Sequence, residues 1–354
     1  MTNAFGYGLA GAAALLLAGC ATTSEPQFKG LPPVSVHATG ETVPVGTNNA
    51  DAADDPAIWR NAANPAASLI VATDKKAGLY VYGLDGKIKS FLNAGRVNNV
   101  DLVEKGGTVY AVASDRNDPR NAKLALFTLD TTSGKLTAIG KVAGGTGEGY
   151  GVCILPGNDA QAFNVFSVLK EGVIADVRVT PGAGTGAAPT GTIVRTLKLQ
   201  TQTEGCALDA QSNSLYVGEE DVGIWRFDAT GAATEGVKVA SVDNQQLVAD
   251  VEGLAVATAA DGARYLVASS QGDNAYAVYR ISDAKGALRY VGRFAITDGT
   301  LGGAEETDGL ELIIGDFGPA YPGGLFVAQD GHNGTKAQNF KLVSWDAIKA
   351  ALGL

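Results

Sequence analysis

Histidine and cysteine are scarce in this chain. Among 354 residues there are two histidines, His37 and His332, and three cysteines, Cys20, Cys153 and Cys206. Zinc sites are usually built from imidazole and thiolate ligands, and here the two residue types do not cluster along the chain. The composition therefore argues against zinc, and against an esterase or lactonase chemistry that depends on a histidine in its site.

Runs of positive charge are also missing. The chain has 27 Lys and Arg against 37 Asp and Glu, a formal net charge of −10, and no segment is rich in Lys or Arg. A nucleic-acid partner needs a basic surface, so we expect none. A carboxylate-rich site could still hold a polyanionic substrate, but only if cations lay between the protein and the ligand.

No apolar run is long enough for a membrane-spanning helix. Residues 9–18 read LAGAAALLLA, about half the length that a span needs and typical of the hydrophobic part of a signal peptide. The run ends in LAGC at residues 17–20, which resembles the lipobox of bacterial lipoproteins. We therefore expect a signal peptide over residues 1–20, a lipid anchor on Cys20, and export to the outer membrane, the periplasm or the outside of the cell. A plain secretory signal is the alternative.

The predicted mature chain divides into a tether and one domain. Residues 21–36 are rich in Thr, Ser and Pro, which is typical of a flexible tether. No such stretch recurs over residues 37–354, so these residues are expected to form a single domain. Cys153 and Cys206 lie inside it and could form one disulfide or be two small buried hydrophobic residues; the sequence leaves both open.

Short runs of β-forming residues indicate an all-β fold. Forty-seven glycines separate such runs, and the clearest of them are residues 69–73, 78–82, 108–112, 124–127, 214–217, 223–227 and 264–268. Hairpins of one plan recur at a spacing of roughly 50 residues, as four-stranded propeller blades do. The sequence therefore predicts a six-bladed β-propeller with four-stranded antiparallel blades, and a helix only near residues 345–352. A large β-sandwich is the alternative, but it does not explain why charged residues recur at one place in each hairpin.

Acidic and polar residues recur where the predicted strands end. They are Asp51, Asp54, Asp55, Lys75, Lys76, Asn98, Asn99, Asp101, Arg116, Glu148, Tyr150, Lys170, Glu204, Glu219, Glu220, Asp221, Asp250, Glu252, Gln271, Glu305, Glu306 and Asp308. In a propeller these positions meet at one rim of the central channel. Many oxygen ligands together suit Ca²⁺, which binds roughly six to eight of them. The bases among them could grip phosphate oxygens, Arg as a fork and Lys as a point charge.

Ten strings of sequence, in order, carry a family resemblance. They are DAADDPAIW, TDKKAGLYVY, GRVNNVDL, QTEGCALD, LYVGEEDVGIWRF, DVEGLAV, YLVASSQGDNAYAVYR, TDGLEL, PGGLFVAQDG and QNFKLVSW. From about residue 37 to the C-terminus the chain resembles the calcium-dependent β-propeller phytases. The resemblance implies a six-bladed propeller and several calcium ions, some structural and some catalytic. It also implies that the chain acts on phytate or its calcium salt. The lipid anchor and the closed ring favour a monomer that meets the membrane only through that anchor.

The resemblance also implies roles for individual residues. Catalytic roles fall to Glu204, Glu220, Asp250, Glu252, Tyr150, Lys76 and Arg116. Calcium ligands are expected at Asp55, Asp101, Tyr150, Glu204, Glu220, Asp250, Glu252, Gln271, Asp308 and Asp330. Substrate phosphates are expected to bind Lys75, Lys76, Arg116 and Lys170. The chain departs from the family pattern at residues 301–304 and at His332, where family members usually carry acids, and one structural calcium site is affected.

The expected chemistry is hydrolysis of a phosphate monoester. Cations on the phosphate oxygens cancel charge in the transition state, and a water shared between two calcium ions would attack phosphorus directly. Glu204, Glu220, Asp250 and Glu252 would hold the ions and that water, while Lys76 and Arg116 would orient the phosphate. Two rival functions are a calcium-dependent propeller lactonase or esterase, and a calcium-stabilised propeller that only binds partners.

Overall fold

The computed structural model describes residues 1–2, 29–48, 51–182, 187–282 and 285–354. Cys20, nearly all of the predicted signal peptide and the first half of the predicted tether lie outside the described residues. In the described part of the chain, no helix combines the length and the apolar character that a membrane span requires.

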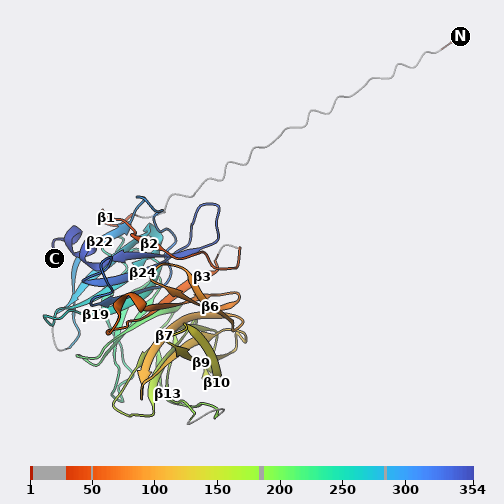
Figure 1. Cartoon of the computed structure of the whole chain (residues 1–354), viewed down its shortest axis with the longest axis vertical. Helices are drawn as coiled ribbons and strands as arrows, with labels where there is room; N and C mark the ends of the chain where they lie inside the picture. Colours follow the sequence, from red (N-terminus) through yellow and green to blue (C-terminus); the bar gives the residue numbers. More distant parts are fainter. Residues whose placement is uncertain (3–28, 49–50, 183–186, 283–284) are drawn as a thin grey trace.

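The described residues form six β-sheets arranged as the blades of a propeller, as predicted (Figure 1). The first three blades contain β3 (Ala53–Trp59), β4 (Leu69–Asp74), β5 (Gly78–Gly83) and β6 (Ile88–Asn93); β7 (Val97–Lys105), β8 (Thr108–Asp115), β9 (Asn121–Asp130) and β10 (Lys135–Thr146); and β11 (Gly149–Leu155), β12 (Phe163–Leu169), β13 (Val173–Thr180) and β14 (Thr190–Lys198). Blades four and five contain β15 (Thr203–Asp209), β16 (Ser214–Glu219), β17 (Gly223–Asp228) and β18 (Val237–Ser241), then β19 (Val251–Thr258), β20 (Arg264–Ser270), β21 (Ala275–Ile281) and β22 (Leu288–Ile296). The sixth contains β23 (Leu310–Ile314), β24 (Gly324–Asp330) and β25 (Asn339–Ser344).

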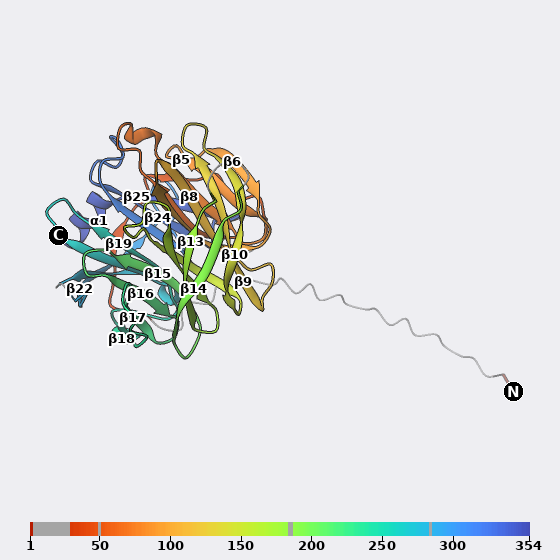
Figure 2. The same cartoon turned by 90° about the horizontal axis from the view of Figure 1, so that it is seen from below.

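The innermost strands of the blades surround a central channel. The inner strands contact one another in the order β3, β7, β11, β15, β19 and β23. Because β23 also contacts β3, the ring is closed. The outer strands β6, β10, β14, β18 and β22 follow one another around the outside (Figure 2). Hydrophobic side chains such as Tyr82, Phe166 and Phe326 are fully buried between the sheets. A closed ring of this kind leaves only short, protected strand edges around the channel and positions six equivalent strand ends around one axis.

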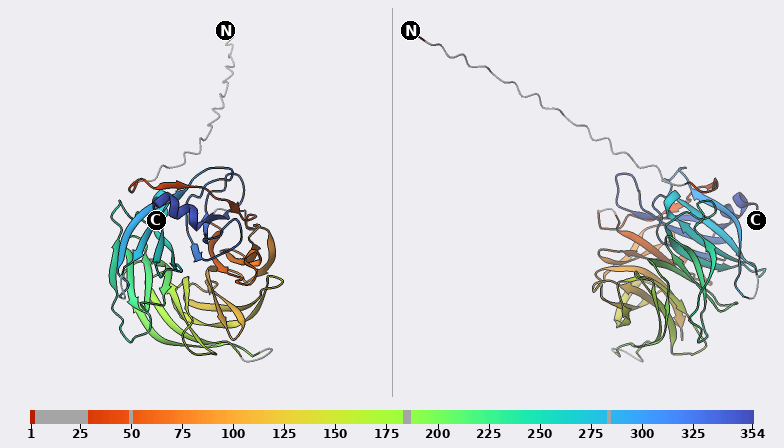
Figure 3. Two further views of the ribbon diagram at one scale, coloured as in Figure 1. Left: turned by 60° about the vertical axis from the view of Figure 1, so that its left-hand side comes forward. Right: turned by 180° about the vertical axis from the view of Figure 1, so that it is seen from behind.

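The N-terminal segment completes the last two blades. β2 (Gly40–Glu41) pairs antiparallel with β25 and is the outer strand of the sixth blade. β1 (Val34–Val36) pairs parallel with β22 and adds a fifth strand to the fifth blade. The blade structure therefore includes the last three residues of the predicted tether, because these residues pair with the open edge of β22. β1 lies beside the C-terminal helix, which is blue in Figure 3.

The local sequence explains both the turns and the single helix. Gly78 and Gly223 begin β5 and β17 with φ of +142° and +137°, and a Cβ at either position would lie 2.2 Å from a carbonyl oxygen of the fourth strand. Only glycine tolerates this combination. The helix α1 (Trp345–Leu352) buries Trp345 and Ile348 and ends at Gly353 with φ of +71°, so the helix expected near residues 345–352 is confirmed.

Candidate active site

A repeated irregularity in the inner strands brings the site together. In β3, β7, β11, β15 and β19 the pairing register shifts between the first and fourth residues of the strand. Such bulges change the direction of side chains. Each of these five strands has a polar residue at its second position, and Asp308 lies just before β23 in the sixth blade. We call these six residues, one from each blade, the channel ring: Asp54, Asn98, Tyr150, Glu204, Glu252 and Asp308.

Glycines let the ring close tightly. The residue after the ring member is glycine in blades three to six: Gly151, Gly205, Gly253 and Gly309. A Cβ at Gly151 would lie 1.9 Å from the Glu204 carbonyl oxygen, and one at Gly205 would lie 2.0 Å from that of Glu252. Neighbouring inner strands can therefore approach each other closely enough for their ring side chains to interact.

Three glutamates form the centre of the site. One carboxylate oxygen from each of Glu204, Glu220 and Glu252 lies within 4.8 Å of the others, and all three residues are buried. Asn98 Nδ2 donates a hydrogen bond of 2.6 Å to Glu204 Oε1. Within the described residues, Glu220 Oε1 and both carboxylate oxygens of Asp54 have no hydrogen-bond partner. The structure therefore gathers buried acceptor oxygens that lack hydrogen bonds, and of these Asp54 Oδ2 lies 3.4 Å from Lys75 Nζ. Buried oxygens of this kind are what a cation site requires.

Burial and mutual repulsion make these acids hard to ionise. Burial raises the pKa of Glu204 well above its ordinary value, and the charges of Asp54 and Asp308 add to this. The pKa of Glu252 is raised in the same way by burial and by Glu204. Burial raises the pKa of Glu220 to about 7 and that of Asp308 to about 7. A bound divalent cation would reverse this effect, because it stabilises the charged form of each carboxyl.

A second set of residues comes from the hairpins that follow the second strands. The first residue of each hairpin donates its backbone N–H to the residue just before the inner strand: Lys75 to Ala52, Arg116 to Arg96, Lys170 to Glu148, Glu220 to Gln202, and Gln271 to Asp250. These residues are therefore equivalent in five blades. This equivalence explains why charged residues recur at one place in the sequence of each hairpin.

The basic side chains lie against members of the channel ring: Arg116 and Lys170 against Tyr150, and Lys75 against Asp54 and Asp308. The Arg116 guanidinium lies 4.6 Å from the centre of the Tyr150 ring, and Lys170 Nζ lies 5.0 Å from it. Lys75 Nζ lies 3.0 Å from Asp308 Oδ2 and 3.4 Å from Asp54 Oδ2. Burial opposes the charge of Lys75, but Asp54 and Asp308 raise its pKa above the ordinary value.

Three further predicted site residues, Lys76, Gln271 and Asp250, lie around the channel ring. Lys76 is partly exposed, and its Nζ lies 3.4 Å from Asp51 Oδ2. Gln271 Nε2 donates to Asp308 Oδ1. Asp250 precedes β19, and burial followed by the charge of Asp221 raises its pKa. The structure thus brings the predicted catalytic and substrate-binding residues to one end of the channel.

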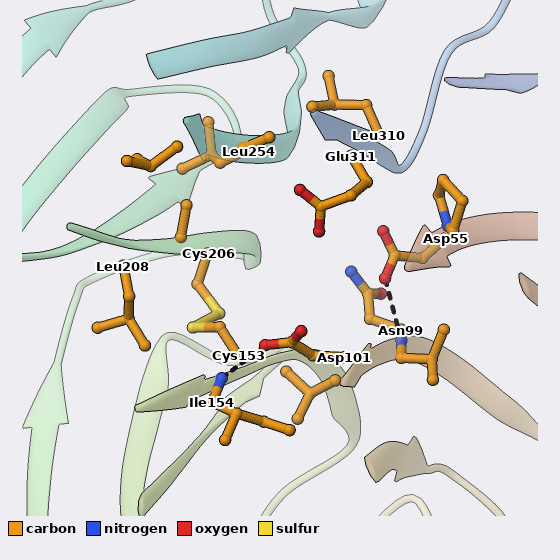
Figure 4. Close-up of a pocket in the computed structure, with 16 residues that line it drawn as sticks. Asp55, Asn99, Asp101, Cys153, Ile154, Cys206, Leu208, Leu254, Leu310 and Glu311 are labelled. Carbon is orange, nitrogen blue, oxygen red and sulfur yellow. Dashed lines mark hydrogen bonds between the residues drawn. A yellow bond between two sulfur atoms is a disulfide. The ribbon is translucent and has the colours of Figure 1, made fainter. Parts of the chain in front are cut away.

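Asp55 and Asp101 lie deeper, in the wall of the channel. They line a cavity of about 160 Å³ together with Glu311 (Figure 4). Val100 N donates to Asp55 Oδ2 at 3.0 Å, and Ile154 N donates to Asp101 Oδ2 at 2.7 Å. Burial raises the pKa of Asp101 to about 6 and that of Glu311 to about 8. This cavity is a second acidic layer below the ring.

The two cysteines also line this cavity, where they are joined by a disulfide (Figure 4). Cys153 belongs to β11 and Cys206 to β15, so the bond links the inner strands of blades three and four.

Asp330 contacts a different set of residues. Its Oδ2 lies 3.2 Å from Lys341 Nζ, which also lies 2.6 Å from Glu41 Oε2. His332 lies beside it, in a surface pocket that includes Gly302. The buried ammonium group of Lys341 thus compensates the charges of both Asp330 and Glu41. Lys341 therefore already offsets charge in the region where the sequence departs from the family pattern.

Some residues of the site have no predicted role. Asp54 and Asn98 are among the recurring polar residues of the sequence, and the structure makes them the ring members of blades one and two. A shared three-residue pattern makes them equivalent to Glu204 and Glu252: an apolar or small residue, then the polar ring residue, then Asp, Asn or Gly. Glu311 faces the deeper cavity, and no pattern in its blade distinguishes it from an exposed acid.

The fold and this site define a class of protein. A closed six-bladed propeller presents buried carboxylates beside lysine and arginine at one end of its channel, a combination suited to cations and anionic ligands together. A family model described as phytase matches residues 7–354. The chain therefore belongs to the phytase family and is an enzyme of that family.

Individual relatives agree with this assignment. A curated 3-phytase of Bacillus subtilis (strain 168) is 39% identical over 367 aligned positions, which cover 98% of this chain and 93% of the relative. Two solved structures are distant likenesses at 13% identity: a GH43_1 enzyme from Xanthomonas citri, with a TM-score of 0.48 over 86% of this chain and 90% of its own, and the soluble aldose sugar dehydrogenase of Escherichia coli, with 0.49 over 83% and 98%. Neither likeness bears on the function of this chain.

Proposed function

We propose that the chain is a calcium-dependent phosphomonoesterase that hydrolyses phytate, myo-inositol hexakisphosphate, to lower inositol phosphates and phosphate. The observation that carries the proposal is the group of three buried glutamates, Glu204, Glu220 and Glu252, within 4.8 Å of one another and beside Arg116 and Lys170. Membership of the phytase family and the name of the 3-phytase relative support the substrate.

The residues present fit calcium. The donors are carboxylate, amide and phenol oxygens, which are the ligands that Ca²⁺ prefers, and Glu220 Oε1 is buried with no hydrogen-bond partner among the described residues. Glu204, Glu220 and Glu252 would hold the ions of the site, and Asp250, Asp308, Gln271 and Tyr150 would offer further oxygen ligands. When bound, calcium would neutralise the facing negative charges and lower the pKa of water at the site.

The protein's own groups then orient the two reactants. Arg116 and Lys76 hold the phosphate that will be cleaved, since a guanidinium and an ammonium group offer several donors to its oxygens. Glu204, Glu220, Asp250 and Glu252 fix the position of the attacking water opposite the leaving inositol oxygen. The attack is direct, and no side chain forms a covalent intermediate.

Phosphate release from phytate across a calcium titration at neutral pH tests this proposal, with the products separated by isomer. We expect release to rise with calcium and to stop in excess chelator. Glu252→Gln is expected to lower kcat by about 100-fold or more, as the loss of a preorganised charged group does. Full activity in excess chelator would exclude the proposed role of calcium. No release under any condition would favour a lactonase, an esterase or a binding protein.

We also propose that the protein is exported and attached to the outer membrane through a lipid on Cys20, as a monomer. The basis is the LAGC sequence after the apolar run of residues 9–18. Incorporation of labelled fatty acid into the wild-type chain but not into Cys20→Ser tests the anchor. Equal labelling of the two chains would contradict it.

A further inference from the structure

Glu219 is a buried carboxylate next to the glutamate centre. It is the last residue of β16, it precedes Glu220 in the chain, and it is 1% exposed. The site described above gives it no role, because the group of three glutamates consists of Glu204, Glu220 and Glu252. A buried carboxyl group that binds no ligand must have its oxygens satisfied by the protein. Its hydrogen-bond partners therefore show what it does.

The protein satisfies both oxygens of Glu219. Oε1 accepts hydrogen bonds from Gln200 N at 2.9 Å, from Thr201 N at 2.8 Å and from Thr201 Oγ1 at 2.8 Å. Oε2 accepts one from Trp225 Nε1 at 2.8 Å. Four donors fill the acceptor capacity of a carboxylate. Glu219 thus differs from Glu220, whose Oε1 has no hydrogen-bond partner among the described residues, and it is suited to holding the backbone rather than a cation.

These contacts fix the segment that enters β15. Residues 200–202 lie between β14 and β15, and Thr203, the first residue of β15, pairs with Glu219 in the sheet. Glu220 N donates to Gln202 O at 3.0 Å. The end of β16 and the start of β15 are therefore joined at each residue of the entering segment.

The join matters because Glu204 lies in a bulge. The register between β15 and β16 shifts between Thr203 and Cys206, and residues within such a bulge are not held by the regular ladder. The position of Glu204 therefore depends on how the preceding segment is held, and Glu219 holds that segment. Glu220 follows Glu219 directly, so one side chain joins the supports of two of the three glutamates.

An equivalent contact recurs in other blades. In blades one, five and six the last residue of the second strand accepts a hydrogen bond from a backbone N–H of the segment that enters the inner strand: Asp74 from Thr47 at 3.2 Å, Ser270 from Val248 at 2.8 Å and Asp330 from Glu305 at 3.2 Å. The contact is therefore a repeated feature of the fold. Glu219 makes it with two backbone N–H groups and a hydroxyl, at the place where two of the glutamates meet.

We propose that Glu219 is a positioning residue of the active site, which holds residues 200–202 against the end of β16 and so fixes the separation of Glu204 and Glu220. This inference rests on the proposed function, because that function requires the two carboxylates to bind cations together. Calcium ligands lie about 2.3–2.6 Å from the ion, so a displacement of about 1 Å is enough to lose a ligand. The length of Glu219 matters in this role, and its charge does not.

Calorimetric titration with calcium alone separates length from charge. Trp225→Phe is the reference protein, because it removes the donor to Oε2 and leaves the contacts of Oε1. In this background Glu219→Gln keeps the length and an acceptor oxygen without the charge, and its calcium affinity should equal that of the reference. Glu219→Asp keeps a carboxyl group on a shorter side chain and is expected to bind calcium about 10-fold more weakly. The reverse order, or equal affinity in all three proteins, overturns the inference.

Kinetics on phytate distinguish positioning from a general loss of stability. Glu219→Ala is expected to lower kcat by about 10-fold or more at saturating calcium, with little change in KM, since the bases that bind phosphate are untouched. Asp209→Asn is the matched control: Asp209 is an acid of the same blade, 2% exposed at the far end of β15 and paired with Arg264. It should lower the melting temperature and leave kcat unchanged. An equal loss of kcat in the two variants contradicts the positioning role.

Amide hydrogen exchange on the full chain as purified tests the inference without calcium binding or hydrolysis. Glu219→Ala should exchange faster than wild type at residues 200–204 and at Glu220, and Asp209→Asn should not. Faster exchange confined to these residues supports the inference, even if the wild-type protein released no phosphate and the proposed function failed. Unchanged exchange in Glu219→Ala overturns the inference and leaves the proposed function intact.

Discussion

At the scale of single residues, two adjacent lysines have different environments. The side chain of Lys75 is 10% exposed and lies between Asp54, Asp308 and Asp51. The side chain of Lys76 is 43% exposed and contacts Asp51 at 3.4 Å. Both were predicted to bind substrate, and that role stays a prediction for each. The structure adds that Lys75 compensates buried carboxylates, which Lys76 does not.

Replacing each lysine should separate these two roles. Lys75→Met leaves Asp54 fully buried without its countercharge, and loss of one partner from a buried pair is expected to cost about 3 kcal/mol of unfolding free energy. Lys76→Ala is expected to change stability by less than about 0.5 kcal/mol, as exposed substitutions usually do, and to raise KM for phytate. Urea unfolding in excess chelator, together with kinetics, measures both. Equal stability of Lys75→Met and wild type would contradict the buried role.

The residues of the site could be predicted only as far as their patterns repeat. Glu204 and Glu252 stand before glycine in similar strings, and the structure brings them together with Glu220. Glu311 carries no such mark, because an acid within a strand looks like an ordinary surface residue. Its position becomes visible only when the six strand ends are arranged around one axis.

At the scale of elements, the sequence predicts strands well when they are long enough to show a pattern. The runs at residues 69–73 and 223–227 lie within β4 and β17, as expected. β1 and β2 could not be predicted, because they contain three and two residues and their partners, β22 and β25, lie near the other end of the chain. Strands this short have no periodicity of their own and form because an open edge is available.

The disulfide between β11 and β15 should stabilise the ring. It closes a loop over a sequence separation of 53 residues, and restricting the unfolded chain in this way typically contributes about 2–4 kcal/mol. The double variant Cys153→Ser, Cys206→Ser is expected to lose that amount in denaturant unfolding while retaining phosphate release from phytate. Wild type treated with a reductant is the matched comparison and should behave in the same way. Unchanged stability in both would show that the bond does not restrict the unfolded chain.

At the scale of the whole molecule, the acidic excess is partly internal. The chain carries a net charge of −10, yet several acids line the channel in two layers, the ring above and Asp55, Asp101 and Glu311 below. Six inner strands that converge on one axis force these carboxyls close together, and the protein supplies few countercharges there. The fold therefore gathers in its centre groups whose protonation responds to pH and, under the proposed function, to bound calcium.

This dependence gives a prediction for the metal-free protein. Burial raises the pKa of Glu311 to about 8 from an ordinary value of 4.5, and those of Glu220 and Asp308 to about 7. An acid whose pKa is higher in the folded state binds more protons when folded, so it stabilises the fold at low pH and that contribution is lost as pH rises. In excess chelator we therefore expect the melting temperature to fall between about pH 4.5 and pH 8.

Calcium and one substitution should each reduce the fall in melting temperature between about pH 4.5 and pH 8. Under the proposed function, saturating calcium should stabilise the ionised carboxylates and raise the melting temperature most at pH 8, where the metal-free protein is expected to be least stable. Glu311→Gln removes one titrating group and should make the metal-free profile flatter in its upper part, while Glu235→Gln, an acid in the loop between β17 and β18, should leave the profile unchanged. A metal-free melting temperature that rises from pH 5 to pH 8 would mean that the channel carboxyls are already ionised in the folded protein. The acidic centre would then be stabilised by groups other than bound cations.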